Sequence, residues 1–253
     1  MKLTIKIRMI WGVKMATIKN QLIPIGTKRR SGKKISKVIF FVDHDTGNAD
    51  STAQNNVDYY INSANTMSAS AHMFVDDLGG IMCVPCFENA EKAWHVLYDR
   101  LEDNKLYGDD ANDVAIGMEL CYFPNDKIRN LKAYNNYIEI AADLCKFHNV
   151  SPTKRSGHFE LDPARRSDPN NALKYIGKTY SDMKKDIVAK YNQLYVKQEV
   201  KPVESAEKVV SDFAKEAQEW TIKNKISDGT RPKDTVTREE MWTMLYRAYQ
   251  LNK

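Results

Sequence analysis

Histidine and carboxylate residues in three separate segments have the chemistry to hold a catalytic metal ion together. His44 comes just after the apolar run "KVIFFV", Glu119 lies within "VAIGMELCY", and His158 lies in "GHFELDPARRSDP", which also contains Asp-Pro pairs at Asp162 and Asp168. Two histidines and one carboxylate with an open fourth position are a common hydrolytic zinc arrangement. Spacing alone is a weak indication, because a single histidine is more often a structural or surface residue. The residue types also leave open which aspartate is the third ligand.

The elements around these residues predict a sheet that presents them at its strand ends. The run "KVIFFV" (37–42) is typical of a buried strand that leads into a polar loop. Over 114–122, larger apolar residues alternate with small ones, which predicts a strand with one core face and one face that carries Glu119. A lone glutamate in a central strand is costly to bury unless it is paired or used. Loops at strand ends are where a rigid sheet holds catalytic residues.

Further periodic segments predict helices and one hairpin. Apolar residues at helical spacing favour helices over 53–64, 131–146 and about 171–195. "HMFVDD" followed by "GGIMCVP" predicts a hairpin around Gly79 and Gly80. Residues 87–103 fit either a helix or a long loop.

Composition is that of an ordinary soluble chain. Apolar residues make up 42% and charged residues 28% of the 253 residues, and no apolar run approaches the ~18 residues of a membrane span. The start, "MKLTIKIRMIWGVK", is too short and interrupted in its apolar stretch for a signal peptide. We therefore expect synthesis in the cytoplasm without export by the ordinary route. Met15 is an alternative start.

Positive charge is concentrated near the N-terminus. Residues 1–37 hold eleven of the 38 Lys and Arg residues and none of the 33 Asp and Glu residues. We interpret residues 1–35 as a basic arm. It is either a solvated or disordered leader or a segment that attracts a polyanion such as nucleic acid or an anionic cell wall.

The four cysteines do not predict a disulfide framework. Cys121 and Cys145 lie in apolar patterns and are most simply core residues. Cys83 and Cys86 form a lone C-x-x-C. This motif fits a redox pair or half of a zinc knuckle, but no second pair follows.

The C-terminal part reads as a small separate module. Residues 196–205 carry mixed charge, a proline and no core pattern, which predicts a linker. Beyond it, apolar residues repeat helically from Val209 to Trp220, and "ISDGTRP" then breaks the pattern. Thr237 with Glu240 fits a capping box at the start of another helix. Residues 206–253 are thus expected to form a helix–loop–helix unit.

Five segments between about 36 and 190 together resemble a known family. They are "FFVDHDTGN", "SASAHMFVDDLGGI", "KAWHV", "VAIGMELCY" and "GHFELDPARRSDP". In order and spacing they resemble the zinc-dependent N-acetylmuramoyl-L-alanine amidases of the amidase-2 type, which share a fold with peptidoglycan recognition proteins. The resemblance implies an α/β fold with a mixed central β-sheet flanked by helices, and a catalytic domain over 36–195.

The resemblance implies three protein ligands for a single zinc ion. His44 matches the first ligand, His158 the second and Asp168 the third. Pro163 matches the internal proline of the family motif, so Asp162 is an ordinary position that turns or caps the chain. The implied cofactor is one zinc ion in the catalytic domain.

The resemblance also implies catalytic and substrate-binding residues. Glu119 matches the acidic residue that assists the attacking water, and Arg166 falls where many members have lysine near the oxyanion. Arginine also supplies donors and stays ionised, so it suits the same role. Trp94 and His95 are expected to line the substrate groove. His72 matches a histidine that is usually not a ligand, so it is either structural or groove-lining.

The C-terminal segment resembles one S-layer-homology repeat, on its helix, "ISDGT" loop and "TREE" helix start. Such repeats bind secondary cell-wall polymers of Gram-positive bacteria, generally as a set of three. The single copy here implies wall targeting, with oligomerisation as one way to achieve it. The alternative is a degenerate packing or dimerisation module.

Together these features predict a phage endolysin that cleaves the bond between N-acetylmuramic acid and L-alanine in Gram-positive peptidoglycan. We expect it to stay in the host cytoplasm until lysis and then act on the wall, with no membrane partner. A bacterial autolysin would share the chemistry but should carry a signal peptide. A non-catalytic peptidoglycan-recognition module would usually lack a zinc ligand. A nucleic-acid binder is not expected, because the basic arm lacks interleaved aromatic residues.

Overall fold

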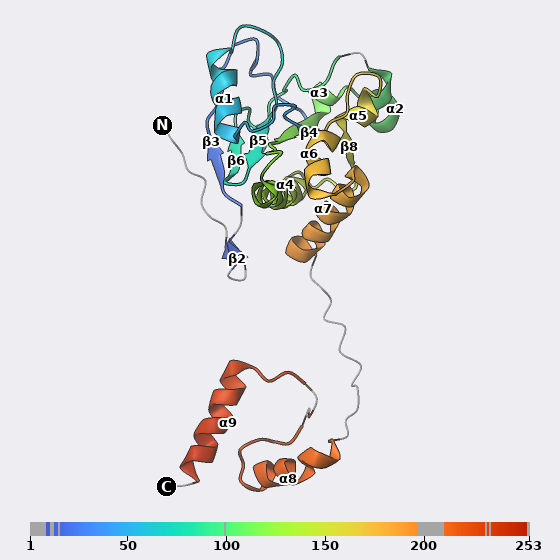
Figure 1. Ribbon diagram of the computed structural model, residues 1–253. Helices are drawn as coiled ribbons and strands as arrows, with labels where there is room; N and C mark the ends of the chain where they lie inside the picture. The colour runs from blue at the N-terminus through green and yellow to red at the C-terminus, as the bar shows by residue number, and fades with distance from the viewer. Residues whose placement is uncertain are drawn as a thin grey trace. The chain divides into compact units, whose positions relative to one another are not determined.

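The chain forms two compact units, Met1–Lys197 and Gln198–Lys253, in the computed structural model (Figure 1). The structure describes residues 9–10, 13–14, 16–98, 100–196, 210–230, 232 and 234–251. None of the helices in these ranges has the length and apolar character that crossing a bilayer requires.

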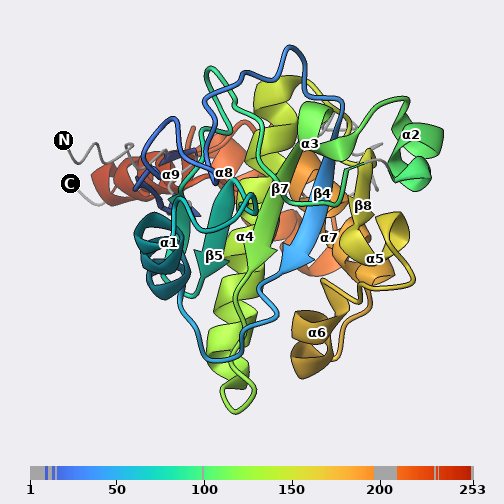
Figure 2. The same ribbon diagram turned by 90° about the horizontal axis from the view of Figure 1, so that it is seen from above.

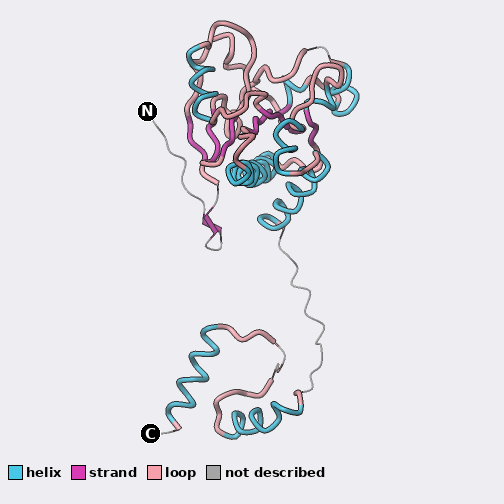
Figure 3. Tube along the Cα trace, viewed as in Figure 1, coloured by secondary structure: helices cyan, strands magenta, loops and turns pink. Residues whose placement is uncertain are grey.

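A six-stranded mixed sheet forms the centre of the first unit (Figure 3). The strand order is β3-β6-β5-β7-β4-β8, with β5 and β6 antiparallel and all other neighbours parallel. The strands are β3 (Ile18–Asn20), β4 (Phe40–Asp45), β5 (Met73–Asp76), β6 (Gly79–Met82), β7 (Ala115–Leu120) and β8 (Arg155–Gly157). A separate ribbon pairs β1 (Met9–Ile10) with β2 (Val13–Lys14).

Helices cover both faces of this sheet, which confirms the predicted α/β architecture. In Figure 2, α4 and α7 lie behind β7 and β4. The apolar residues of α4 and α7 form the main core with one face of the sheet, and α1 packs on the other face. The helices are α1 (Ala53–Asn62), α2 (Leu101–Tyr107), α3 (Ala111–Val114), α4 (Lys127–His148), α5 (His158–Leu161), α6 (Asn170–Leu173), the 3-10 turn η1 (Lys174–Ile176) and α7 (Tyr180–Tyr195).

The alternation predicted for 114–122 is confirmed in β7. Ile116, Met118 and Leu120 point into the main core beneath the sheet. Gly117 and Glu119 therefore belong to the opposite face, since successive side chains of a strand alternate. This face is the floor of the functional site described below.

Several predicted elements form with different bounds. Strand β4 continues past the apolar run and includes His44, so this histidine is fixed by sheet pairing and does not lie in a loop. The predicted hairpin is present, but Asp76 pairs with Gly79, which puts the turn two residues earlier than expected. Helix α4 is longer than predicted because Asp126 caps its start and Asn149, with a φ of 54°, ends it. Most of the ambiguous 87–103 stretch is loop.

The interpretation of 1–35 as a basic arm is wrong for residues 16–35, which are part of the first unit. Strand β3 pairs with β6 at one edge of the sheet, and Ile23 is fully buried. Two of the basic residues are also buried. Arg29 donates to the backbone oxygen of Ser63, and Arg30 forms an ion pair with Glu91 at 2.7 Å. These charges serve the fold, which net charge alone does not reveal.

The second unit contains α8 (Lys215–Lys223), preceded by the 3-10 turn η2 (Asp212–Ala214), and α9 (Arg238–Gln250). The predicted capping box at the start of α9 is confirmed, since Thr237 and Glu240 cap each other. The predicted first helix begins later than expected, at Lys215, and Val209 lies outside the described residues. Most of the predicted linker, from residue 197 on, and residues 206–209 of the predicted module also lie outside them.

Candidate metal and catalytic site

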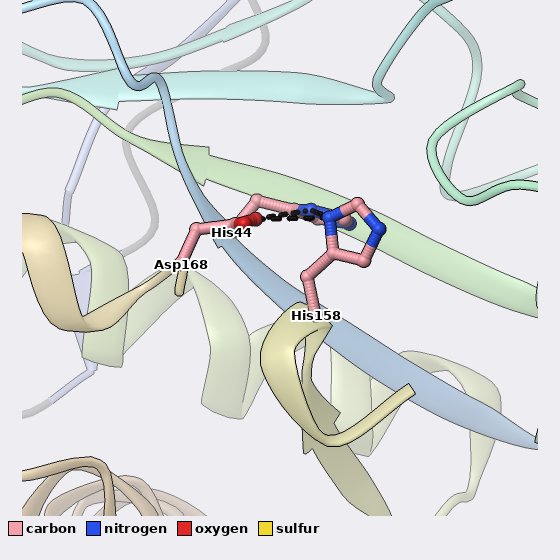
Figure 4. A group of neighbouring side chains, drawn as sticks. All are labelled: His44, His158 and Asp168. Carbon is pink, nitrogen blue, oxygen red and sulfur yellow. Dashed lines mark hydrogen bonds and ion pairs between the residues drawn. The ribbon is translucent and has the colours of Figure 1, made fainter. Parts of the chain in front are cut away.

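Two strands and a loop bring three potential ligands to one point. His44 lies in β4, and β8 pairs directly with β4, so that His158, the first residue after β8, comes beside it. Asp168 comes from the loop before α6. His44 Nδ1 and His158 Nδ1 both lie 3.0 Å from Asp168 Oδ2, and the two nitrogens are 3.1 Å apart (Figure 4). All three side chains are buried and converge from different elements.

The spacing and charge of this cluster fit a zinc ion. Zn–N and Zn–O bonds of about 2.0–2.1 Å put the ligand atoms of a tetrahedral site about 3.3 Å apart. Burial opposes ionisation of Asp168, but hydrogen bonds with His158 and His44 hold its pKa well below the usual range. Burial lowers the pKa of His158 to about 4. An ionised carboxylate beside a neutral imidazole is the state that binds a cation.

The structure separates the two aspartates that the sequence left open. Among the residues it describes, His44, His158 and Asp168 are the one group of ligand side chains close enough to share an ion. Asp162 instead lies at the end of α5 and forms an ion pair with Arg165. Its Oδ1 atom also lies 3.7 Å from Nη1 of Arg100. The interpretation of Asp162 as a turn residue fits these contacts.

Glu119 lies on β7 directly opposite His44 in the parallel pairing of β4 and β7. Its Oε2 atom is buried and has no hydrogen-bond partner among the residues that the structure describes. Burial, partly offset by the charge of His44 and reinforced by Asp168, raises the pKa of Glu119 to about 8. A carboxyl group with a pKa near the working pH can both accept and donate a proton.

These residues share one polar cavity of about 310 Å³. Trp94, His95 and Arg166 also line it. The guanidinium of Arg166 is exposed, and within the described residues it has no ion pair. The lining residues are His44, Asp45, Thr46, Gly47, Tyr60, Ala69, Ser70, Trp94, His95, Glu119, His158, Arg165, Arg166, Ser167, Asp168 and Asn171.

His72 does not line this cavity, so of its two predicted roles the groove-lining one, and with it substrate binding, is not supported. Its side chain is fully buried. Nε2 bonds to the backbone oxygen of Glu91 at 2.8 Å, and Nδ1 accepts a hydrogen bond from the backbone N–H of Gly117 at 3.0 Å. Both ring nitrogens are occupied by the backbone, and burial lowers the pKa of His72 to about 4. The structural alternative is the one that the contacts support.

The cysteines lie apart from this chemistry. All four are free and buried, which confirms the interpretation of Cys121 and Cys145 as core residues. Burial raises the pKa of both Cys83 and Cys86, so neither is a ready thiolate. No zinc knuckle or redox pair is supported among the described residues.

Sequence reasoning missed several residues of the cavity. Tyr60, within the helix predicted over 53–64, was not predicted as a site residue, yet it lines the cavity from α1. Asp45 and Asn171 meet at 3.2 Å and tie the end of β4 to the start of α6. The position of Asp45 right after His44 was the only signal available for these contacts.

Comparison with known proteins places this geometry in a family. The N-acetylmuramoyl-L-alanine amidase family matches residues 34–171. The catalytic domain of XlyA is similar at 25% identity and a TM-score of 0.52, over 67% of this chain and 98% of that one.

Two further solved structures share the fold. A mutant endolysin from Bacillus subtilis is 24% identical, with a TM-score of 0.54 over 68% of this chain and 99% of that one. The Staphylococcus aureus hydrolase AmiA, in complex with its ligand, is 21% identical, with a TM-score of 0.55 over 71% of this chain and 85% of that one. A search of curated proteins found no match.

Proposed function

The chain belongs to the N-acetylmuramoyl-L-alanine amidase family, which matches more than half of its length, and we propose on this premise that it hydrolyses the amide bond between N-acetylmuramic acid and L-alanine in peptidoglycan. The buried cluster of His44, His158 and Asp168, with Glu119 beside it, is the observation that carries the proposal. A recognition module without catalysis would need neither a complete ligand set nor a buried carboxyl group without a partner.

His44, His158 and Asp168 would hold one zinc ion. Zinc, when bound, lowers the pKa of water to about 7 and polarises a carbonyl oxygen. The two imidazoles are neutral ligands and Asp168 is the single anionic one, so the ligand set leaves an excess of positive charge for the substrate. The open side of the cluster faces the cavity, where Glu119 and Arg166 lie.

Glu119 would transfer the proton that hydrolysis must move. The Glu119 carboxylate takes a proton from the attacking water while the oxygen of that water bonds to the amide carbon. The same proton then passes to the L-alanine nitrogen as the C–N bond breaks. Its free Oε2 and raised pKa support both steps.

Arg166 would stabilise the negative charge that develops on the amide oxygen. Its positively charged guanidinium lines the cavity and offers several N–H donors. A donor in this position contributes roughly 3–4 kcal/mol in comparable enzymes. Arg165, its neighbour, is already paired with Asp162 and is less available for this role.

A defined substrate tests this activity. The purified chain, supplied with zinc, should release a peptide with a free N-terminal L-alanine from a synthetic N-acetylmuramoyl peptide. Removal of metal with a chelator should stop the reaction and added zinc should restore it. Binding of the substrate without any cleavage, in a zinc-loaded protein, would favour the recognition-module alternative.

We further propose that the chain acts as a phage endolysin on Gram-positive walls, held in the host cytoplasm until lysis. The similar fold of a Bacillus subtilis endolysin supports this role. A bacterial autolysin with the same chemistry is the alternative. Lysis from without of Gram-positive cells, with no lysis of cells that express the chain internally, is the expected result. Lysis of the expressing cells by the chain alone would contradict it.

The second unit would bind a secondary polymer of the cell wall, either as a single copy or after several copies of the chain associate. In its described part only Ile226 is a buried apolar residue, while Trp220, Trp242 and Tyr246 are more than half exposed. Exposed rings at this density suit stacking on sugars or packing against another copy. Purified walls stripped of secondary polymer should retain less of the chain than intact walls. Equal retention would contradict polymer binding.

A further inference from the structure

The metal ligand His44 has a buried partner on the side away from the metal cluster. Its Nδ1 faces Asp168 and His158, at 3.0 and 3.1 Å. Its Nε2 lies 3.2 Å from Nδ1 of His95, and the two rings meet edge-on at 83°. Both nitrogens of His44 are therefore occupied, one by the cluster and one by His95.

The chemistry of imidazole indicates which of the two rings donates the hydrogen bond between His44 Nε2 and His95 Nδ1. A neutral imidazole carries a single N–H, and the nitrogen without hydrogen is the one that can bind a cation. For Nδ1 of His44 to act as a ligand, Nε2 must carry the hydrogen. We propose that His95 is a positioning residue, which accepts this hydrogen at its Nδ1 and so holds His44 in the tautomer and orientation that bind the metal. This inference rests on the proposed metal site.

His95 is itself held rigidly enough to do this. Its backbone N–H donates to Oδ1 of Asn112 at 2.9 Å, and Asn112 is fully buried. Its ring lies against Gly117 of β7, where a Cβ atom would come within 2.6 Å of the ring. The absence of a side chain at Gly117 therefore makes the room that His95 occupies.

The ring of His72 supports the same arrangement from behind. Its centroid lies 5.6 Å from that of His95, and its Nδ1 accepts the backbone N–H of Gly117. Three histidine rings thus follow one another from the interior to the metal cluster. Gly117 and His72 thus both help to fix the position of the His95 ring.

A histidine differs from the usual partner of a metal-bound imidazole. Carboxylates, backbone carbonyls and water are the common acceptors. A carboxylate at this place would add a second buried negative charge beside Asp168. A neutral imidazole orients His44 without reducing the positive charge that zinc offers to the substrate.

Metal affinity tests this role directly. Zinc affinity would be measured on the full chain by competition with a chromophoric chelator, with the fold of each metal-free variant checked by circular dichroism. Loss of a supporting partner typically lowers metal affinity by about 10–100-fold. We expect such a loss in His95→Phe, which keeps a ring but has no acceptor.

Matched variants separate the hydrogen bond from packing. His95→Asn places an amide oxygen near the Nδ1 position and should retain more zinc affinity than His95→Gln, whose amide lies farther out. Gly117→Ala should weaken zinc binding with every histidine still present. His148→Ala is the control, because His148 contacts the backbone oxygen of Cys86 outside the cavity, and it should bind zinc normally.

The outcomes distinguish this inference from the proposed function. Unchanged zinc affinity in folded His95→Phe, or equal affinities in His95→Asn and His95→Gln, would overturn the positioning role alone. Unchanged zinc affinity in His44→Ala would overturn the metal site itself. If His95→Phe does not fold, the comparison of the two amide variants still decides.

Discussion

Replacement of Glu119 by glutamine should slow hydrolysis and stabilise the metal-free protein at the same time. The amide has nearly the shape of the carboxyl group but cannot accept a proton. Glu119 is not one of the three clustered ligands, so zinc affinity should persist. The substitution therefore isolates proton transfer from metal binding.

The kinetic effect follows from the role of general acid and base. Such a group contributes typically 10²–10⁴-fold to the rate. This corresponds to roughly 3–5 kcal/mol in the activation barrier. No other cavity carboxylate is placed to substitute, because Asp168 belongs to the ligand cluster and Asp45 accepts hydrogen bonds from Asn171 and Ala172. We therefore expect Glu119→Gln to lower the rate of hydrolysis by the whole contribution of this group, about 10²–10⁴-fold.

The effect on stability follows from the raised pKa of Glu119. Below its ordinary value of 4.5, the group is protonated in both the folded and the unfolded protein, and it contributes nothing. Between 4.5 and about 8 the unfolded chain ionises first, and each pH unit costs the fold about 1.36 kcal/mol. At pH 7, which is 2.5 pH units above 4.5, the cost is at most roughly 3.4 kcal/mol, and replacement by glutamine removes it.

Two measurements check this pair of effects. Turnover of an N-acetylmuramoyl peptide would be compared at saturating zinc, and urea unfolding would be followed in chelator at pH 7 and pH 4. The variant should be more stable than the unchanged chain at pH 7 and equal to it at pH 4. Turnover within a few-fold of normal would refute the proton-transfer role. Lower stability at pH 7 would refute the claim that the buried carboxyl group is costly.

Other substitutions test the remaining parts of the site and fold. Asp168→Ala should lose zinc in equilibrium dialysis, whereas Asp162→Ala should retain it, and equal behaviour would contradict the choice of ligand. Arg166→Met should lower kcat by about 10²–10³-fold and Arg166→Lys should retain most of it, since the role is a positive donor at the oxyanion; an inert Arg166→Met would exclude that role. Glu91→Ala should cost roughly 3–5 kcal/mol in urea unfolding at pH 7, because the buried Arg30 loses its partner. The pKa of Glu91 is lowered in the fold from its ordinary value of 4.5, so this difference should be fully present above about pH 4.5 and shrink as the pH falls through the folded pKa. A difference that is independent of pH would contradict the ion pair.

Sequence patterns predicted the parts of this site that depend on strand periodicity. The alternation in β7 placed Glu119 on the face opposite the core, and the apolar run before His44 predicted a strand there, although the strand was expected to end before His44. The choice of Asp168 over Asp162 came from the resemblance to a family, since residue chemistry alone does not separate the two. The structure explains the choice through the ion pairs that occupy Asp162.

Contacts between distant segments were beyond sequence reasoning. The sequence suggested that the basic N-terminal stretch is solvated, because it shows the positive charges but not the distant residues that contact them in the fold. Arg30 finds Glu91 in a remote loop, and Ile23 is buried beneath residues that no local pattern connects to it. The contact between His44 and His95 is of the same kind, since 51 residues separate the two rings.

Digestion of purified Gram-positive cell walls tests the central claim most directly. The zinc-loaded chain should release new N-terminal L-alanine without new reducing sugar ends, and His44→Ala should release neither. This result would establish cleavage between N-acetylmuramic acid and L-alanine at the site built around His44. New reducing ends without new L-alanine termini, or full release by His44→Ala, would contradict it.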